Sequence, residues 1–345
     1  MPPTVRRSRK KKGPRPYDPD RRVVAVTGAH SFLGAELLRR LERDPRFGKL
    51  LAIDVRRPDG LERSEFHRLD LTAPNAASLC GEILSEARVD TFVHLAFLSG
   101  PTHNSTWAHE LEAIGTVHVL EACSLARVRK FVMSSTTGVY GPHPLNPNFL
   151  PETAELRGLG QSRFFNDKVE AEREAQRFQE ESQDAVVTVL RFAPILGPGI
   201  SNYVSRFFRR PAMPVLMGFD PLLQLVHEDD AVTALELACD HDFPGAFNIV
   251  GEGVLPYTTM IARLGKLPVP IPHFVAYPLA KLLWMTQVME SPPTFLDWLR
   301  YLCVADGRKA RELLGFIPRH DVRGILDDFL GLPASHASSA EDVRP

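Results

Sequence analysis

The stretch RVVAVTGAHSFLG, residues 22–34, joins an apolar, β-branched run to a helical pattern through a glycine turn. This order of strand, tight turn and helix is typical of the first unit of a nucleotide-binding α/β fold. Gly28 permits the tight turn, and Gly34 permits close packing of the helix on the sheet. We expect the helix to begin at Ser31 or Phe32 and to present free backbone N–H groups to a pyrophosphate.

An acidic residue closes the second apolar run. Asp54 ends KLLAID, residues 49–54, about twenty residues after the last glycine, where a carboxylate accepts hydrogen bonds from a ribose. It would repel a 2′-phosphate, so we predict NAD as the cofactor, with NADP less favoured. Arg56 and Arg57 follow it and weaken that preference. The alternative is an ordinary helix-start turn with an unrelated aspartate at a strand end.

The alternation of short apolar runs with longer amphipathic ones continues and predicts parallel strands joined by helices. The expected strands are residues 22–28, 49–55, 90–97, 130–136 and 186–193. The expected helices are residues 32–44, 75–87, 109–126 and 166–182. Right-handed crossovers stack such units into a doubly wound parallel sheet, a Rossmann fold, with the ligand cleft beyond the carboxyl ends of the strands.

The composition of the sequence changes after about residue 196, where prolines and glycines cluster in LGPGISNYV and RRPAMPVLMGF. We therefore expect a smaller, interlocked C-terminal substrate lobe covering the cleft. The predicted division is a nucleotide-binding domain over 21–196, with its sheet completed by 223–250, and a lobe over 197–222 and 251–332. Residues 1–20 and 333–345 have the composition of disordered tails.

The first sixteen residues carry seven arginines and lysines and no acid, whereas the whole chain of 345 residues has a formal charge of −1. Such a tail can contact nucleic acid or an anionic membrane, or be a solvated leader. It lacks the apolar run of a secretory signal. The nearest long apolar stretch, 274–289, is interrupted by Pro278 and Lys281, so we expect a lobe helix lining the pocket rather than a membrane contact.

The cysteines suggest neither a disulfide framework nor a metal site. They lie far apart, without CxxC spacing or neighbouring histidines, and are Cys80, Cys123, Cys239 and Cys303. We expect a cytoplasmic protein. We also expect the group HEDD, residues 227–230, to be a strand end and an acidic helix start rather than a metal cluster.

Several ordered motifs resemble the extended short-chain dehydrogenase/reductase superfamily, the group of nucleotide-sugar epimerases and dehydratases. They are TGAHSFLG at 27–34, VHLAF at 93–97, SSTTGVYG at 134–141, LRFAPILGPG at 190–199 and LVHEDDAVTAL at 225–235. The resemblance spans about residues 22–330. It implies a cofactor site made by Gly28, Ser31, Phe32, Leu33, Gly34, Asp54, Asp70, Leu71, Leu95, Ala96, Lys168 and Pro194.

The chain departs from the family pattern at its catalytic pair. Where the family has a tyrosine four residues before a lysine, this sequence has Phe164 before Lys168. By resemblance, Lys168 would hold the nicotinamide ribose and Thr136 would bond the reacting oxygen. A phenyl ring has no proton to give, and losing a positioned acid or base costs about 100- to 10,000-fold in rate. Tyr140 is the nearest phenol along the chain, although by resemblance it is structural or lines the pocket.

Three further departures lie in the glycine turn, near the active site and after Thr136. Ser31 replaces the middle glycine of the turn, so a hydroxyl stands where the backbone would approach the phosphates. Glu112 stands where the family more often has asparagine, and we expect a solvated helical glutamate rather than a new acid. The acidic pair of the dehydratases is missing after Thr136, where Thr137 and Gly138 stand.

Three functional hypotheses follow. The leading one is a NAD-binding, reductase-like protein with reduced or absent redox catalysis that acts on or senses a small ligand, such as a nucleotide-sugar. The second is an active NAD-dependent epimerase or oxidoreductase that uses another proton donor. The third is an interaction scaffold docking through its basic tail. The resemblance also implies a homodimer through helices near 105–127 and 160–182, and Arg209, Arg210 and Arg300 are possible diphosphate partners.

Overall fold

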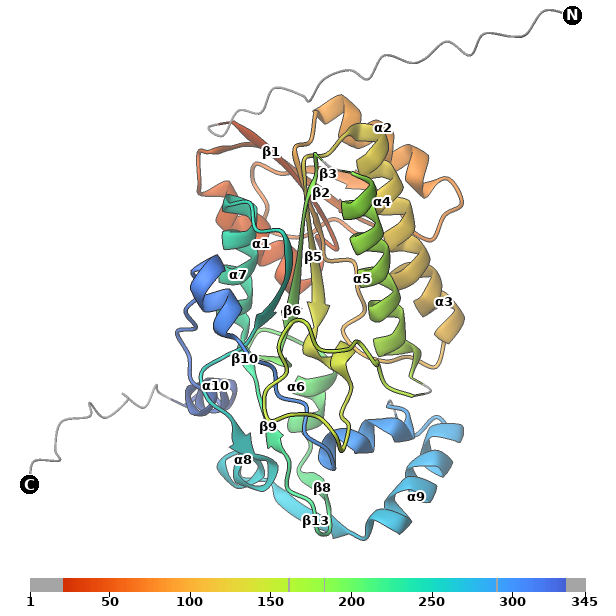
Figure 1. Ribbon diagram of the computed structural model, residues 1–345, viewed down its shortest axis with the longest axis vertical. Helices are drawn as coiled ribbons and strands as arrows, with labels where there is room; N and C mark the ends of the chain where they lie inside the picture. Colours follow the sequence, from red (N-terminus) through yellow and green to blue (C-terminus); the bar gives the residue numbers. More distant parts are fainter. Residues whose placement is uncertain (1–20, 161, 183, 290, 333–345) are drawn as a thin grey trace, which may run out of the picture.

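The computed structural model describes residues 21–160, 162–182, 184–289 and 291–332. Its centre is one seven-stranded sheet in the order β11-β6-β5-β4-β1-β2-β3, with every neighbouring pair parallel (Figure 1). The strands are β1 (Arg22–Thr27), β2 (Phe47–Asp54), β3 (Glu65–Arg68), β4 (Thr91–His94), β5 (Lys130–Thr136), β6 (Val186–Phe192) and β11 (Gly245–Ile249). The expected doubly wound α/β fold is confirmed.

Helices cover both faces of the sheet (Figure 1). On one face, α1 (Phe32–Glu42) packs beside α7 (Glu228–Asp240) in a shared apolar core. The other face is covered by α2 (Ala76–Ala87), α4 (Gly115–Ala126) and α5 (Arg163–Glu181). Because the sheet is buried from both sides, the strands are apolar along their length rather than alternating. The strand order reverses between β1 and β4, which places the cleft at their carboxyl ends.

The helix that leads into α4 is not continuous. α3 (Ser105–His109) is followed by a π-helical turn, η1 (Glu110–Ile114), before α4 begins. A short 3-10 turn, η2 (Thr137–Tyr140), follows β5. π-turns of this kind are rare and are frequent at functional sites.

The smaller lobe lies beyond the carboxyl ends of the strands (Figure 1). Its helices are α6 (Tyr203–Phe208), α8 (Tyr257–Arg263), α9 (His273–Met285), the 3-10 helix η3 (Pro293–Leu299) and α10 (Val322–Phe329). The π-turn η4 (Ala310–Leu314) packs instead in the core that α1 and α7 share beside the sheet. Its strands form three pairs, β7 (Ile195–Leu196) with β10 (Val226–His227), β8 (Ala212–Leu216) with β13 (Leu267–Ile271), and β9 (Leu222–Leu223) with β12 (Leu255–Pro256). A third apolar core fills this lobe.

One expected strand does not join the main sheet. We expected the segment beginning LQLVHEDD to return a strand and a helix to the sheet, but β10 is two residues long and pairs with β7. The helix α7 and strand β11 do return, so 223–250 supplies elements to the main layers. The division into two domains stays a prediction. The basic tail and the C-terminal tail lie outside the described residues. Within the described part of the chain, no helix combines the length and apolarity needed to cross a membrane.

Candidate cofactor and catalytic site

The turn between β1 and α1 has room only for glycines at two positions. Gly28 has φ +67°, and a Cβ there would lie 2.5 Å from the carbonyl carbon of Leu95. A Cβ on Gly34 would lie 2.3 Å from the carbonyl oxygen of Gly28. These contacts fold the turn tightly against the end of β4, where Leu95 and Ala96 follow the strand. The helix start is thereby held at the carboxyl edge of the sheet.

Ser31 caps the helix that follows. Its Oγ accepts a hydrogen bond from the backbone N–H of Gly34, at 3.1 Å. A hydroxyl that accepts in this way still has its own proton to donate. The N–H groups of Phe32 and Leu33, in the first turn, have no partner within the helix. The serine therefore acts as a cap and leaves donors for an anion at the helix N-terminus.

The carboxylate of Asp54 is oriented toward this turn. Its Oδ2 accepts from the N–H of His30 at 3.0 Å, and its Oδ1 accepts from the N–H of Arg56 at 3.3 Å. Further along the same edge, Asp70 is exposed and accepts from the N–H and hydroxyl of Thr72, while Leu71 is buried. The turn, the helix start and these carboxylates fit a dinucleotide, with the pyrophosphate at α1 and a ribose at Asp54.

Lys168 lies enclosed at the other end of the cleft. Its Nζ donates to Oε1 of Glu112 at 2.6 Å, and the side chains are 7% and 0% exposed respectively. The same ammonium lies 3.8 Å from the centroid of the Phe164 ring and 5.5 Å from that of Phe97. A cation over an aromatic face is attracted by the ring quadrupole. Lys168 is thus held by a carboxylate and two phenyl rings.

The expectation of a solvated glutamate at 112 is wrong. Glu112 is completely buried, and its Oε1 also accepts from the N–H of Leu98 at 2.8 Å. Its Oε2 is buried without a hydrogen-bond partner among the described residues. Burial raises the pKa of this carboxyl, against the opposing charge of Lys168. The π-turn η1 carries Glu112, and Thr116 donates to the Glu112 carbonyl at 2.5 Å.

Phe164 belongs to an aromatic cluster that the sequence patterns did not reveal. Its ring centroid lies 5.6 Å from that of Tyr203 and 6.4 Å from that of Phe295. Phe165 and Trp298 extend the cluster, with ring centroids 5.5 Å apart. The one sequence signal for this cluster was the high aromatic content of PTFLDWLRY, residues 293–301. Nothing in a single sequence showed that this segment packs against α5, which lies about 130 residues earlier.

The hydroxyl residues predicted beside the catalytic pair differ in exposure. Thr136 is partly exposed and its Oγ1 accepts from the N–H of Gly138 at 3.1 Å, capping η2. Tyr140 is fully buried, donates to Asn248 at 2.6 Å and accepts from Arg191 at 2.9 Å. Arg191 in turn donates to both oxygens of the Glu172 carboxylate.

Burial raises the pKa of Tyr140 to about 12. A phenol enclosed in this way, with its oxygen engaged on both sides, has no route to a ligand in the cleft. Tyr140 therefore ties η2 to Arg191 on β6 and to Asn248 on β11 in this structure. Its use as a replacement base is not supported by the geometry.

The comparisons with known proteins agree with this geometry. The sequence profile described as "NAD dependent epimerase/dehydratase family" matches residues 24–250. An uncharacterized protein of Mycobacterium tuberculosis, Rv0501, is 33% identical over 316 residues, which cover 89% of this chain and 83% of that protein. The chain belongs to the NAD dependent epimerase/dehydratase family.

Solved structures share the fold at lower identity. MoeE5 in complex with UDP-glucuronic acid and NAD superposes with a TM-score of 0.71 at 23% identity, covering 90% of this chain and 98% of that one. UDP-glucose 4-epimerase from Thermotoga maritima, with UDP-glucose, has a TM-score of 0.70 at 21% identity, covering 89% and 97%. The predicted membership of the extended short-chain dehydrogenase/reductases is confirmed.

Two cavities adjoin the Phe164 cluster. One, of about 290 Å³, lies inside the lobe and is lined by Pro194, Tyr203 and Phe295 among others. The other, of about 900 Å³, reaches Phe164 from the side of α3 and α9. Helix α9, which covers most of the apolar segment 274–289, lines both cavities, as the sequence predicted for a lobe helix.

Of the three arginines predicted as diphosphate partners, only Arg210 lines the lobe cavity. Arg209 lies over the ring of Phe329, with its guanidinium carbon 5.3 Å from the centroid. Arg300 lies over Phe219 and Tyr301, at 5.0 and 4.8 Å.

The residues HEDD at 227–230 form the end of β10 and the start of α7, as expected. Glu228 accepts from the N–H groups of Gly199 and Ile200, which fixes the loop after β7 beside α1. A different group, His109, Asp167 and Glu170, places possible ligand atoms within 4.8 Å of one another. His109 and Asp167 are hydrogen-bonded at 2.9 Å, and we assign no metal to them.

Proposed function

We propose that this chain is a NAD-binding member of the epimerase/dehydratase family whose redox catalysis is reduced or absent, and that it binds a small ligand in its lobe. The observation that carries the proposal is the state of Lys168. The Glu112 carboxylate engages its ammonium at 2.6 Å, and the Phe164 ring covers it at 3.8 Å. In the family resemblance this lysine acidifies a tyrosine, and this chain has neither the phenol nor a free ammonium.

The cofactor part rests on the fit of the turn. Phe32, Leu33 and the Ser31 hydroxyl would hold the pyrophosphate, and Asp54 would hold a ribose, with Asp70 and Leu71 beside the adenine. Bound NAD would supply a hydride acceptor. The structural relatives MoeE5 and UDP-glucuronic acid 4-epimerase from Bacillus cereus are complexes with NAD, which supports the choice of cofactor.

The same pair of residues favours one alternative. The buried Oε2 of Glu112 has no partner among the described residues, and burial raises the pKa of its carboxyl. Such a group is suited to general acid–base work. In this second candidate, the chain is an active NAD-dependent enzyme in which Glu112 handles the proton.

The experiment that tests the proposal begins with the nucleotide that copurifies with the protein. We expect NAD or NADH on release and chromatography. The protein, loaded with NAD, is then mixed with UDP-glucose and UDP-glucuronic acid, the ligands named for the relatives. Absorbance of reduced cofactor detects a net oxidation, and chromatography of the nucleotide-sugars detects an epimerisation, which leaves the cofactor oxidised. Turnover at an ordinary enzymatic rate that is abolished by Glu112→Gln would refute the proposal and establish the alternative.

Three expectations concern other parts or properties of the protein and stay predictions. They are a homodimer through the helices around 105–127 and 160–182, contact of the basic tail with nucleic acid or anionic membrane, and a cytoplasmic location. Sedimentation of the full chain, alone and with vesicles or oligonucleotides, measures the first two.

A further inference from the structure

The lobe cavity has an unusual lining for a protein whose structural relatives hold nucleotide-sugars. Its wall is made mainly of aliphatic and aromatic side chains from α6, β9, β13, α9 and η3, among them Phe207, Leu223, Ile271, Leu283 and Leu299. Sugar hydroxyls and a nucleobase need many hydrogen-bonding partners, because each polar group buried without one costs free energy. This wall offers few.

Besides the arginines, polar side chains are a minority of the wall, and they are Tyr203, Gln224, Ser291, Trp298, Tyr301 and Cys303. Gln224 is occupied by the backbone of Ala305, donating to its carbonyl at 3.1 Å and accepting from its N–H at 3.0 Å. Trp298 has a buried indole N–H without a partner among the described residues. An indole N–H is a donor only, so it adds a site for an acceptor on a ligand.

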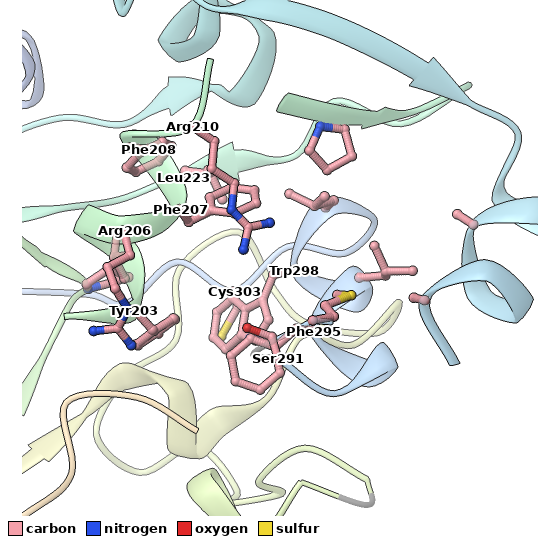
Figure 2. A pocket seen from close by; sticks show the side chains of 18 of the residues that line it. Tyr203, Arg206, Phe207, Phe208, Arg210, Leu223, Ser291, Phe295, Trp298 and Cys303 are labelled. Carbon is pink, nitrogen blue, oxygen red and sulfur yellow. The ribbon is translucent and has the colours of Figure 1, made fainter. Parts of the chain in front are cut away.

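The charged side chains of the cavity wall are all positive among the described residues. Arg206 and Arg210 line the cavity, and among the described lining residues there is no aspartate or glutamate. Figure 2 shows the Arg210 guanidinium pointing toward the middle of the ring of lining side chains, in the direction of Trp298. A guanidinium at the edge of an apolar chamber favours a carboxylate or phosphate over a neutral group.

We propose that the lobe cavity binds an amphiphilic anion, in which an apolar body fills the chamber and a single carboxylate or phosphate is held by Arg210. This inference deepens the ligand-binding part of the proposed function and rests on it. It replaces the nucleotide-sugar by a ligand whose recognition is mainly apolar. Tyr203 and Phe295 line this chamber and contact the ring of Phe164, which lines the neighbouring cavity.

The test uses isothermal titration calorimetry on the full chain, with and without NAD. The probes, kept below their micelle concentrations, are decanoate, decyl phosphate, the neutral decanol, and UDP-glucose. We expect both anions to bind and decanol to bind about tenfold or more weakly. In the series hexanoate, octanoate and decanoate, affinity should rise about fourfold per added methylene. The tighter of the two anions identifies the head group.

Two neighbouring arginines provide the variant and its control. Arg210→Gln should weaken both anions about tenfold or more and leave decanol unchanged. Arg209→Gln should change neither, because Arg209 lies over Phe329 and is not a lining residue. Both side chains are on exposed residues, so loss of folding does not confuse the comparison.

The outcomes separate this inference from the proposed function. UDP-glucose binding more tightly than either anion, or equal effects of the two arginine variants, would overturn it. A chain that binds NAD but none of the amphiphiles contradicts the inference and leaves the proposed function intact. A chain that binds the amphiphiles but not NAD supports the inference and contradicts the cofactor part of the proposed function.

Discussion

Two departures from the family pattern, Glu112 and Phe164, both contact the same side chain, that of Lys168. If a tyrosine stood at 164, an uncompensated ammonium would lower the pKa of its phenol. In this chain Glu112 neutralises the ammonium, and Phe164 places a ring where the phenol would be. A buried ammonium without a partner would be costly. The Glu112 carboxylate therefore gives the buried Lys168 ammonium a hydrogen-bonding partner in place of the phenol that is missing at position 164.

This pairing changes the expected result of restoring the tyrosine. From sequence alone, Phe164→Tyr would be expected to raise turnover. Because Glu112 still holds Lys168, we now expect the phenol introduced by Phe164→Tyr to keep a pKa near or above its usual value of about 10. In the double variant Glu112→Asn, Phe164→Tyr, the freed ammonium should lower that pKa by about one unit or more.

Ultraviolet difference titration measures the introduced phenol directly, after subtraction of the native titration, and needs no substrate. Glu112→Asn alone is the matched control and should add no new transition. Equal phenol pKa values in the single and double variants would show that Glu112 does not control Lys168.

Asp54 is the residue on which cofactor choice depends. Its carboxylate is held by the N–H groups of His30 and Arg56 beside the turn, where it would repel a 2′-phosphate. We expect the native chain to bind NAD more tightly than NADP, and Asp54→Ala to narrow the difference. Calorimetry with both nucleotides measures this, with Asp59→Ala in the following loop as control. Equal or tighter binding of NADP by the native chain contradicts the prediction.

At the scale of elements, the part that one sequence could not predict is the π-turn η1. We expected a solvated glutamate at 112, because an acidic side chain on a helix is seldom buried without a partner. The π-turn that carries Glu112 interrupts the α-helical hydrogen-bond pattern, and no local pattern predicted it. The partner that permits the burial of Glu112, Lys168, lies 56 residues further along the chain. By contrast, the strand and helix signals around Gly28 and Gly34 were local, and they predicted the turn correctly.

Charged groups also fasten α7 to the starts of the strands. Arg22, 4% exposed, donates to Asp240 at 2.7 Å, and Arg46 binds the same carboxylate. Burial raises the pKa of Asp240, but the hydrogen bonds from Arg22 and Arg46 outweigh it, so the net pKa is lowered. A lowered carboxyl pKa stabilises the fold above the unfolded value, near 4, and this contribution is lost as pH falls through the folded value.

We therefore expect Asp240→Asn to lower the free energy of unfolding at neutral pH by about 1.5–3 kcal/mol. The difference from the native chain should shrink as pH falls below about 4, where the unfolded carboxyl binds a proton first, and should vanish once pH passes below the lowered folded pKa. Urea unfolding across a pH series measures it. Asp229→Asn, at an exposed ion pair 3.4 Å from Arg40, is the control and should change little. A deficit that persists undiminished in acid would contradict the assignment to charge.

At the scale of the whole molecule, the repeated strand and helix pattern predicted the sheet. The family resemblance assigned the motifs along the chain to successive strand ends and helices. The lobe was harder to predict because its elements are short and pair in twos, such as β9 with β12. Contacts of this kind join residues far apart in the chain, for example Gln224 with Ala305. The periodicity of a local sequence window does not predict such long-range contacts. The aromatic cluster around Phe164 and the lining of the lobe cavity could therefore be recognised only from the structure.

These long-range contacts have a thermodynamic consequence. The chain passes from the sheet to the lobe after β6, returns with α7 and β11, and leaves again after β11. The pairing of β7 with β10, and of Gln224 with Ala305, joins the segments of these crossings. We therefore expect one cooperative unfolding transition, in which NAD bound at the sheet also stabilises the lobe.

At a free NAD concentration one hundred times its dissociation constant, the stabilisation should be about 2.7 kcal/mol. Differential scanning calorimetry measures the number of transitions, and fluorescence of Trp298, in a background with the other tryptophans replaced by phenylalanine, reports the lobe alone. Both signals should move to higher temperature together on addition of NAD. Trp298 lines the lobe cavity, so its fluorescence follows the unfolding of the lobe. If the lobe melts in a separate transition whose temperature NAD does not raise, the sheet and the lobe are energetically independent in spite of the crossings that join them.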